Sequence, residues 1–307
     1  MKKSAPAKKS LRIPAFAKIN SCLHIIAKRP DGYHELRTIF QTISLRDTLH
    51  LSLKKDSDLF ELLFTSDDPA MPLGNDNLVV RAVHAFQREF GLRGSLGVHL
   101  EKKIPVARGL GGGSSDAAAT LIGLMRLAEA SLPLAKMIKL AAGLGADVPF
   151  FLFGGRALAV NRGDEIYPLA DLPKRSVVVV SPKGIGVSTK DAYEWASAEL
   201  TKDAEPHKLF RFCALCWSRQ ESRLSNDFES PVFRRHPRLE EIRAGLLQRG
   251  AADAALAGSG SAVFGIFRNP AQARRAAKKF PEDQVFLCAT ISRAAYTRAL
   301  WGGAGLA

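Results

Sequence analysis

Apolar and polar positions in the first third of the chain follow two different periods. Four apolar-rich segments have the length and composition of strands, namely residues 13–19, 21–27, 38–44 and 48–53. Residues 77–90 instead repeat apolar side chains at helical spacing, and Gly91 stands where that helix would end. The pattern predicts a mixed α/β unit at the N-terminal side.

A glycine-dense stretch, PVARGLGGGSSDAAA (residues 105–119), follows a strand-like alternation over residues 98–104. An alanine-rich apolar run through Leu127 comes next, so the predicted order is strand, glycine loop, helix. Ser114 or Ser115 is the expected N-cap of this helix. Glycines let backbone N–H groups turn inward, and inward amides at a helix N-terminus bind anions, most often phosphate.

Other interpretations of the loop fit less well. No Gly-Lys-Ser/Thr sequence ends it, as a Walker A loop requires, and Ser114 stands where the dinucleotide fingerprint has its third glycine. A structural turn or flexible linker is the remaining alternative, but linkers rarely lie tightly between a strand and a patterned helix.

A third helix is predicted over residues 132–142, and Asp147 follows it just before Val148-Pro149. That position suits a helix N-cap, or the first turn of a short helix with an apolar wall behind it. The residue type alone leaves the cap and a chemical role for Asp147 both open.

A second unit begins near residue 174. It has predicted strands at 176–180 and 285–289, a glycine loop entering a β-rich run at 254–267, and helices at 189–199 (capped by Ser188), 226–235, 238–248 and 271–279. Residues 200–210 are polar and predict a mobile connection. The expected organisation is a basic, disordered tail (1–10), an N-terminal domain (11–173), a C-terminal domain (174–300) and a short tail (301–307).

The composition is that of a soluble protein, with 46% hydrophobic and 24% charged residues in 307. No apolar run reaches membrane-spanning length, and no apolar segment follows the lysines of residues 1–9, so we expect a cytoplasmic protein without a membrane partner. The net charge of +14 permits nucleic-acid binding. It equally suits an enzyme with polyphosphate substrates. Because basic residues are dispersed and aromatics make up only 8%, we expect ordinary solvated surface charge and a disordered tail rather than a nucleic-acid interface.

Four cysteines occur, two of them in the CxxC spacing of Cys213 and Cys216. This pair lies in a helical pattern and has no second Cys/His pair at ligand spacing, so we expect buried thiols rather than a zinc site.

Four motifs together resemble the GHMP kinase superfamily, and they occur in its order: AKIN (17–20), RPDGYHEL (29–36), PVARGLGGGSSDAA (105–118) and GSGSAVFG (258–265). GADVPFF (145–151) lies between the last two. The resemblance implies an α/β (α+β) fold with two domains and an active site in the cleft between them. PDGYHEL and the triple glycine further resemble the branch that uses ATP to phosphorylate the 2-hydroxyl of a cytidine diphosphate-linked methylerythritol, a small-molecule substrate on the non-mevalonate route to isoprenoids.

The resemblance also implies site residues. Lys18 and Asp147 match the catalytic pair, with Asp147 as the base. ATP would be bound by Asn77, Pro105, Gly109, Leu110, Gly111, Gly112, Gly113, Ser114 and Ser115. The substrate would be bound by Asn20, Tyr33, His34, Thr189, Tyr193, Gly258, Ser259 and Gly260, with cytosine between Tyr33 and Tyr193.

Each of these residues also has a simpler explanation: a surface lysine for Lys18, a turn residue for Tyr33, a structural histidine for His34. Mg²⁺ is expected with ATP, but the sequence identifies no acidic ligand for it, and it does not indicate the oligomeric state. Two other functions stay open. One is a GHMP kinase for mevalonate, homoserine or a sugar, and the other is an RNA-binding module, which would leave the glycine loop unexplained.

Overall fold

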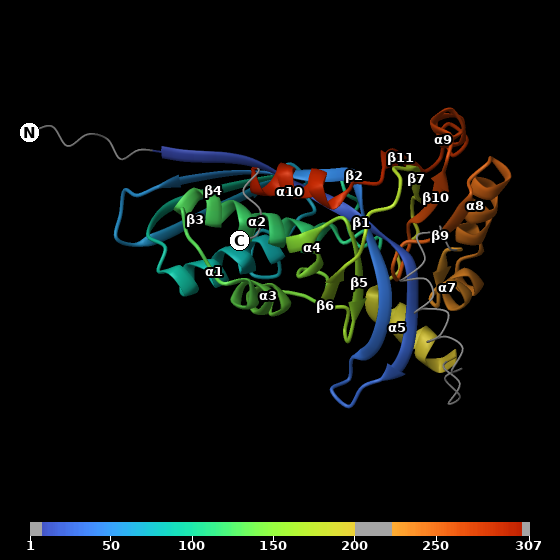
Figure 1. Cartoon of the computed structure of the whole chain (residues 1–307), viewed down its shortest axis with the longest axis horizontal. Coiled ribbons are helices and arrows are strands. Elements are labelled where there is room, and N and C mark those ends of the chain that lie inside the picture. Colours follow the sequence, from blue (N-terminus) through green and yellow to red (C-terminus); the bar gives the residue numbers. More distant parts are fainter. Residues whose placement is uncertain (1–7, 200–222, 303–307) are drawn as a thin grey trace, which may run out of the picture.

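Two long antiparallel strands, β1 (Lys8–Lys28) and β2 (His34–Lys54), run through the molecule (Figure 1). The computed structural model describes residues 8–199 and 223–302. Each strand was predicted as two shorter ones; register shifts bend the pair without ending it. The predicted tail over residues 1–10 is too long, because Lys8–Ser10 pair with the residues of β2 around Leu53.

These strands are the centre of a seven-stranded sheet in the order β3-β4-β2-β1-β8, with β5 beside β2 and β6 beside β5. The other strands are β3 (Phe60–Ser66), β4 (Gly94–Glu101), β5 (Arg156–Val160), β6 (Glu165–Pro168) and β8 (Ser225–Asn226). The strand predicted over 98–104 begins earlier and ends at Glu101, so the residues leading into the glycine loop lie outside the sheet.

Five helices pack on this sheet or on one another: α1 (Leu78–Phe90), α2 (Gly112–Ala128), α3 (Leu134–Ala142), α4 (Phe150–Phe153) and α10 (Arg293–Trp301). The last of these was not predicted. Its Tyr296 and Leu300 are fully buried in the core of the first unit, with α10 packed against α2 and β1 (Figure 1). The chain therefore returns to the first unit at its end, and the predicted domain boundary at residue 300 is wrong for this helix.

The second unit is a four-stranded antiparallel sheet in the order β11-β7-β10-β9, covered by helices. Its elements are β7 (Ser176–Ser181), α5 (Thr189–Glu199), α7 (Glu229–Arg235), α8 (Pro237–Gln248), β9 (Asp253–Leu256), β10 (Val263–Phe267), α9 (Pro270–Ala277) and β11 (Gln284–Ala289). The predicted cap of α5 is confirmed, since the Ser188 hydroxyl accepts a hydrogen bond from the Asp191 amide. The helix predicted from residue 226 begins only at Glu229, because Asn226 belongs to β8 and pairs with β1.

A shared hydrophobic cluster joins the two units. Ile19, Ile43 and Leu110 from the first unit pack in the same cluster as Val179 and Phe264 from the second. The junction is therefore a packed core, and the loops around it are held in fixed positions. The polar connection predicted at 200–210 and the CxxC pair lie outside the described residues.

Candidate active site

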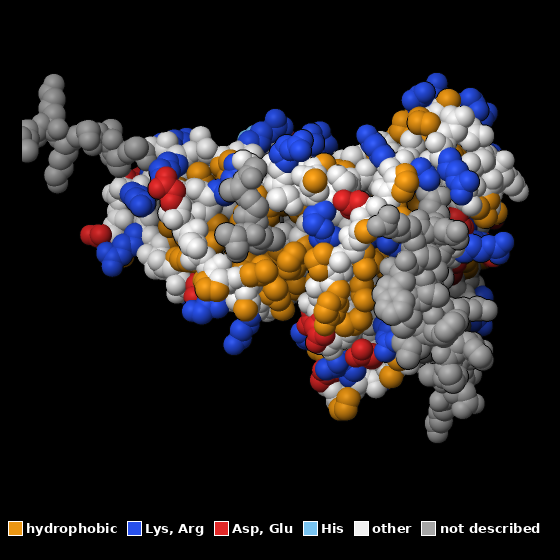
Figure 2. Space-filling view, viewed as in Figure 1, with side chains coloured by type: hydrophobic (Ala, Val, Ile, Leu, Met, Phe, Trp, Pro, Cys, Tyr) orange, Lys and Arg blue, Asp and Glu red, His pale blue; other side chains and the backbone are white. Residues whose placement is uncertain are grey.

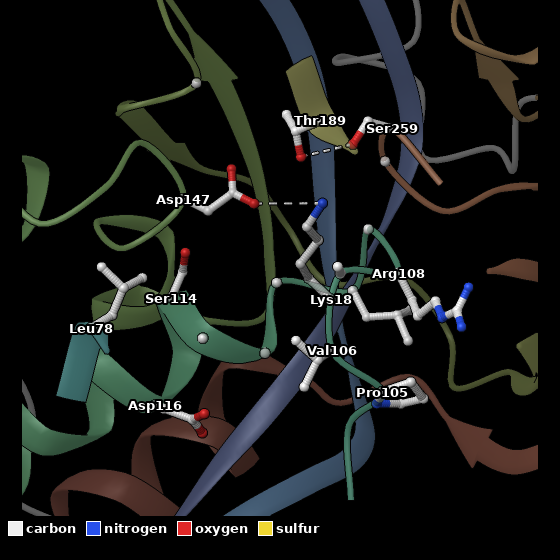
Figure 3. A pocket seen from close by; sticks show the side chains of 18 of the residues that line it. Lys18, Leu78, Pro105, Val106, Arg108, Ser114, Asp116, Asp147, Thr189 and Ser259 are labelled. Carbon is white, nitrogen blue, oxygen red and sulfur yellow. Dashed lines mark hydrogen bonds and ion pairs between the residues drawn. The ribbon is translucent and has the colours of Figure 1, made fainter. Parts of the chain in front are cut away.

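A cavity of about 410 Å³ lies where the two units meet. Its walls come from β1, the start of α1, the glycine loop and the start of α2 in the first unit, and from α5 and the loop after β9 in the second (Figure 3). These segments are far apart in sequence, yet they contain most of the residues that the sequence motifs single out.

The glycine loop has the backbone conformation that only glycine adopts easily. Gly109 and Gly111 have φ of 75° and 71°. A Cβ on Gly109 would lie 1.7 Å from the carbonyl oxygen of Ala257, so the loop touches the backbone of the second unit directly. Both glycines are therefore required by the fold itself.

The helix after this loop begins earlier than the sequence predicts. Gly111 is the N-cap of α2, so Ser114 and Ser115 lie in its first turn and cap nothing. The helix begins at this earlier position because the left-handed φ of Gly111 already turns the chain into the helix. The first amides of α2 therefore have no side-chain hydrogen-bond partner. Free amides at the positive end of the helix dipole can bind phosphate.

Lys18 and Asp147 face one another across the cavity, with the Lys18 Nζ 3.6 Å from the Asp147 Oδ2 (Figure 3). The Lys18 side chain is 5% exposed and that of Asp147 is 32% exposed. Burial lowers the pKa of Lys18, and the nearby Asp147 carboxylate partly opposes that shift. Asp147 does not cap the helix after it, because Pro149 holds that place without a side-chain bond.

A chain of hydrogen bonds fixes the lysine. Lys18 Nζ donates to Asn20 Oδ1 at 2.9 Å, and Asn20 Nδ2 donates to Thr38 Oγ1 at 2.7 Å. The Thr38 hydroxyl in turn donates to the Cys22 carbonyl. Asn20 is thus a buried residue that orients the ammonium of Lys18, and it also lines the cavity.

The loop after β9 forms the wall of the cavity on the side of the second unit. Gly258 and Gly260 have positive φ, and a Cβ on Gly258 would lie 3.1 Å from Lys18 Nζ. Ser259 lines the cavity, and its hydroxyl lies 3.3 Å from that of Thr189 at the start of α5 (Figure 3). This loop therefore lies against both Lys18 and the glycine loop.

The remaining residues expected at the nucleotide differ in their placement. Asn77 lines the cavity, but its side chain is engaged as the cap of α1 and by the Pro72 carbonyl. Leu110 is buried, and its carbonyl accepts the amide of Lys18. Pro105, Gly112, Gly113 and Ser114 also line the cavity. Ser115 is 1% exposed and is not part of the cavity wall.

A second cavity, of about 910 Å³, adjoins the first and contains Tyr33, His34 and Tyr193. The two tyrosines do not face each other as a pair. The ring of Tyr193 stacks on His34 with centroids 4.8 Å apart, whereas Tyr33 is 55% exposed and lies under the guanidinium of Arg162. Asp147 and Thr189 belong to the walls of both cavities.

The cations around this second cavity were not predicted from the sequence. Lys28, Arg162 and Lys190 line it, from β1, the β5–β6 connection and α5. Asp147 and Glu194 also line this cavity, so its walls carry more cations than carboxylates, which favours an anionic ligand.

A buried charge cluster beside the glycine loop was also not predicted from the sequence. Lys102 Nζ lies 2.5 Å from Asp47 Oδ2 and 3.0 Å from Asp116 Oδ2, and all three side chains are almost fully buried. Asp47 also accepts the amides of Lys103 and Ile104. Burial raises the pKa of Asp116, and the Lys102 ammonium opposes that shift. The cluster links β2, the segment that enters the glycine loop, and α2. It was not predicted because the neighbouring lysines Lys102 and Lys103 resemble ordinary surface charge in the sequence.

In the part of the chain that the structure describes, no three His, Cys, Asp or Glu side chains are grouped so that they could hold a metal ion. None of the helices described there combines the length and the apolar composition of a membrane span. On the face shown in Figure 2, Lys and Arg side chains are scattered rather than gathered in one stripe.

The fold and this site define a kinase of the GHMP class. The GHMP kinases N terminal domain family matches residues 77–155, and the GHMP kinases C terminal family matches residues 214–284. A mevalonate kinase structure from Methanococcus jannaschii covers 92% of this chain and 99% of its own, with a TM-score of 0.69 at 14% identity, which shows the shared fold.

Proteins with higher sequence identity to this chain identify its family within the GHMP kinases. A Solibacter usitatus protein named 4-diphosphocytidyl-2-C-methyl-D-erythritol kinase is 44% identical over 296 residues, which cover 94% of this chain and 90% of the relative. A crystal structure of 4-(cytidine 5'-diphospho)-2C-methyl-D-erythritol kinase is 35% identical, has a TM-score of 0.74 and covers 91% of this chain and 99% of its own. The chain belongs to the 4-diphosphocytidyl-2-C-methyl-D-erythritol kinase family.

Proposed function

We propose that this protein transfers the γ-phosphoryl group of ATP to the 2-hydroxyl of 4-diphosphocytidyl-2-C-methyl-D-erythritol. The observation that carries the proposal is the position of Asp147, which lies in the wall of both cavities and 3.6 Å from Lys18. A donor bound at the glycine loop and an acceptor bound beside Tyr33 would meet at this carboxylate. Transfer between two bound substrates needs such a meeting point.

ATP occupies the cavity of about 410 Å³ in this proposal. Its phosphates bind the free amides at the start of α2, between Gly111 and Ser114, where the helix dipole favours negative charge. The base lies toward the start of α1, where Asn77 and Leu78 belong to the wall.

The acceptor occupies the second cavity, with its cytosine ring against the aromatic side chains of Tyr33, His34 and Tyr193. Insertion of the ring between Tyr33 and Tyr193 requires His34 to leave the face of Tyr193 that it covers. The cations Lys28, Arg162 and Lys190 are suited to the diphosphate.

In the chemical step, the acceptor oxygen attacks the γ-phosphorus while its proton passes to the Asp147 carboxylate. The bond between the γ-phosphorus and the bridging oxygen breaks, and ADP leaves with that oxygen. Lys18 orients the Asp147 carboxylate, 3.6 Å away, and stabilises the negative charge around the transferred group. Asn20 holds Lys18 in place through the 2.9 Å hydrogen bond.

Mg²⁺ normally accompanies ATP in such transfers, held by one or two protein oxygens together with phosphate oxygens. The Ser114 hydroxyl points into the cavity on the side of Asp147 (Figure 3) and fits this preference. Ser114 would hold the ion together with phosphate oxygens, and the ion would neutralise phosphate charge. Because the proposed donor is ATP, we also propose that the reaction takes place in the cytoplasm.

The alternative is a GHMP kinase for mevalonate, homoserine or a sugar. Those acceptors would leave the aromatic and cationic walls of the second cavity without a ligand. The test is ADP release by the purified protein with four acceptors: the cytidine diphosphate-linked substrate, methylerythritol phosphate, mevalonate and homoserine. We expect turnover with the first alone; comparable turnover without the cytidine group, or a preference for mevalonate or homoserine, contradicts the proposal.

A further inference from the structure

The turn between β1 and β2 (Figure 1) carries the motif RPDGYHEL (29–36), and the proposed function uses only Tyr33 and His34 of it. Arg29 begins this turn and belongs to the wall of neither cavity. Its guanidinium nevertheless forms hydrogen bonds to three side chains, two within the motif and one outside it. Arg29 is therefore a fixed part of the turn rather than a solvated surface charge.

Two of these contacts shape the turn itself. Arg29 Nε donates to the Asp31 carboxylate at 3.1 Å, and Nη1 donates to Glu35 Oε2 at 3.2 Å. Asp31 also accepts the amide of Tyr33 at 3.1 Å, while the amide of Arg29 donates to the Tyr33 carbonyl at 2.8 Å. The backbone of Tyr33 is thus held at both its N–H and its C=O, which fixes the direction in which its side chain leaves the turn.

The third contact links the turn to the connection between β5 and β6. Arg29 Nη1 also donates to the side-chain oxygen of Asn161, which follows β5 and has a φ of 63°. The Asn161 carbonyl accepts the amide of Leu36 at 2.7 Å. The next residue, Arg162, has its guanidinium 4.9 Å from the centre of the Tyr33 ring. The turn is therefore attached to this connection through a side chain, the backbone and the ring.

Other contacts join the turn to α5. The His34 ring stacks on Tyr193 with centroids 4.8 Å apart, and His34 Nε2 lies 2.7 Å from the Ser197 hydroxyl. In the proposed function His34 leaves the face of Tyr193 so that cytosine can enter, which removes the stacking contact. The hydrogen bond between Arg29 and Asn161 involves none of these groups. The turn then stays supported from the β5–β6 connection.

We infer that Arg29 is a positioning residue of the acceptor site: it holds the turn against the β5–β6 connection, so that the Tyr33 ring stays where cytosine stacks on it. The inference rests on the proposed acceptor, and Arg29 itself contacts no substrate. Ion pairs at the protein surface contribute little to the free energy of unfolding, so the role of this network is geometric. A wall that is already ordered strengthens binding, because the ligand does not have to order it.

The position of Arg29 predicts a specific division of effects. Arg29→Ala should raise the KM for the acceptor about tenfold, the lower end of the loss expected for a whole stacked ring. The kcat at saturating acceptor and the KM for ATP should stay within about twofold of wild type, because Arg29 lies outside the cavity that contains Lys18 and Asp147. Arg29→Lys should recover only part of the affinity, since an ammonium cannot replace the planar fork of a guanidinium.

The experiment is calorimetric titration of cytidine and of cytidine 5'-diphosphate into wild type, Arg29→Ala and Arg29→Lys, with initial rates for ATP and acceptor. We expect Arg29→Ala to lose affinity for both ligands by the same factor. If only the diphosphate binds more weakly, the guanidinium contacts phosphate directly and the inference is wrong. Equal affinities in all three proteins also overturn it. If wild type binds neither ligand and does not phosphorylate the acceptor, the proposed function itself fails.

A double variant tests whether the arginine acts through the ring. In a Tyr33→Ala background, Arg29→Ala should weaken binding of cytidine 5'-diphosphate by less than about twofold further, because the ring that it positions is already gone. Effects of the two single variants that multiply in the double variant would show independent roles and contradict the inference.

Two more variants separate the link from the charge. Asn161→Gly keeps the positive φ but removes the oxygen that Arg29 contacts, so it should raise the KM for the acceptor in the same direction. An unchanged KM in Asn161→Gly would show that the link is not needed and would overturn the inference. Arg238→Ala is the matched control, since Arg238 also bonds two carboxylates, Glu241 and Asp283, and lines neither cavity. It should bind both ligands like wild type; a loss equal to that of Arg29→Ala would assign the effect to net charge.

Discussion

The carboxylate of Asp147 lies 3.6 Å from the ammonium of Lys18, and the two come from different elements: Lys18 from the middle of β1 and Asp147 from the turn before α4. Asp147 is 32% exposed while Lys18 is almost fully buried. A partly exposed carboxylate beside a buried ammonium can accept a proton from a bound alcohol without leaving its partner.

Asp147→Asn tests this pairing. The amide keeps the shape of the side chain but cannot act as a base, so kcat should fall about 10²- to 10⁴-fold with the melting temperature nearly unchanged. Asp191→Asn, an exposed carboxylate on the first turn of α5, is the matched control and should keep full activity. Loss of stability in Asp147→Asn, with turnover per folded molecule intact, would assign the aspartate a structural role.

Gly109 in the glycine loop and Gly113 in the first turn of α2 should respond in opposite ways to the same substitution. Gly109→Ala places a Cβ 1.7 Å from the Ala257 carbonyl and forces an unfavourable φ, so the free energy of unfolding should fall by more than about 1 kcal/mol. Gly113→Ala meets only Leu78 at 3.7 Å and lies in a helix, where alanine is preferred by roughly 0.5–1 kcal/mol. Urea denaturation of both variants measures the contrast, and equal effects would contradict the close approach of the two loops.

Tyr33→Ala tests the aromatic wall of the second cavity. Stacking on a ring contributes about 1–3 kcal/mol per base in single-stranded nucleic-acid sites, so the KM for the cytidine-containing acceptor should rise roughly tenfold to a hundredfold. The KM for ATP should stay the same, since Tyr33 does not line the other cavity. Tyr167→Ala, an equally exposed tyrosine on β6, should change neither constant. Wild-type kinetics in Tyr33→Ala would show that this ring does not contribute to acceptor binding.

Removal of the Lys102 ammonium should destabilise the protein. Lys102→Met leaves the buried carboxylates of Asp47 and Asp116 without their cation, and breaking a buried pair in this way costs about 3–5 kcal/mol. Lys103→Met changes the exposed neighbouring lysine and should have little effect on the free energy of unfolding. Equal unfolding midpoints for the two variants would show that the cluster contributes nothing net.

His24 should make stability depend on pH. Burial opposes its charge, but the Asp227 carboxylate, 3.1 Å from Nδ1, and Cys22 outweigh that effect and raise the pKa of His24 to about 9. The stabilisation is complete below the unfolded pKa of about 6.5 and is lost as pH rises through 9. The difference in free energy of unfolding between wild type and His24→Gln should therefore shrink between pH 6 and pH 10. A constant difference would contradict the charged pair.

Local sequence determined the features that depend on a few neighbouring residues. Asn77 caps α1 and Gly91 ends it because both effects act within one helical turn. The glycine loop before α2 was predictable for the same reason, since positive φ at Gly109 and Gly111 is a property of the residue type. The motif order likewise indicated the family that similarity confirms.

Tertiary structure decided what depends on segments far apart in the chain. The distance between Lys18 and Asp147, the stacking of His34 on Tyr193 and the return of α10 to the first unit all result from the path of the whole chain. Hydrophobic burial drives such contacts, and it is not directional, so periodicity indicates that a face is buried but not what covers it. The cluster around Lys102 shows the same limit: its charges resemble surface residues in the sequence, and only the packing of β2 and α2 buries them together.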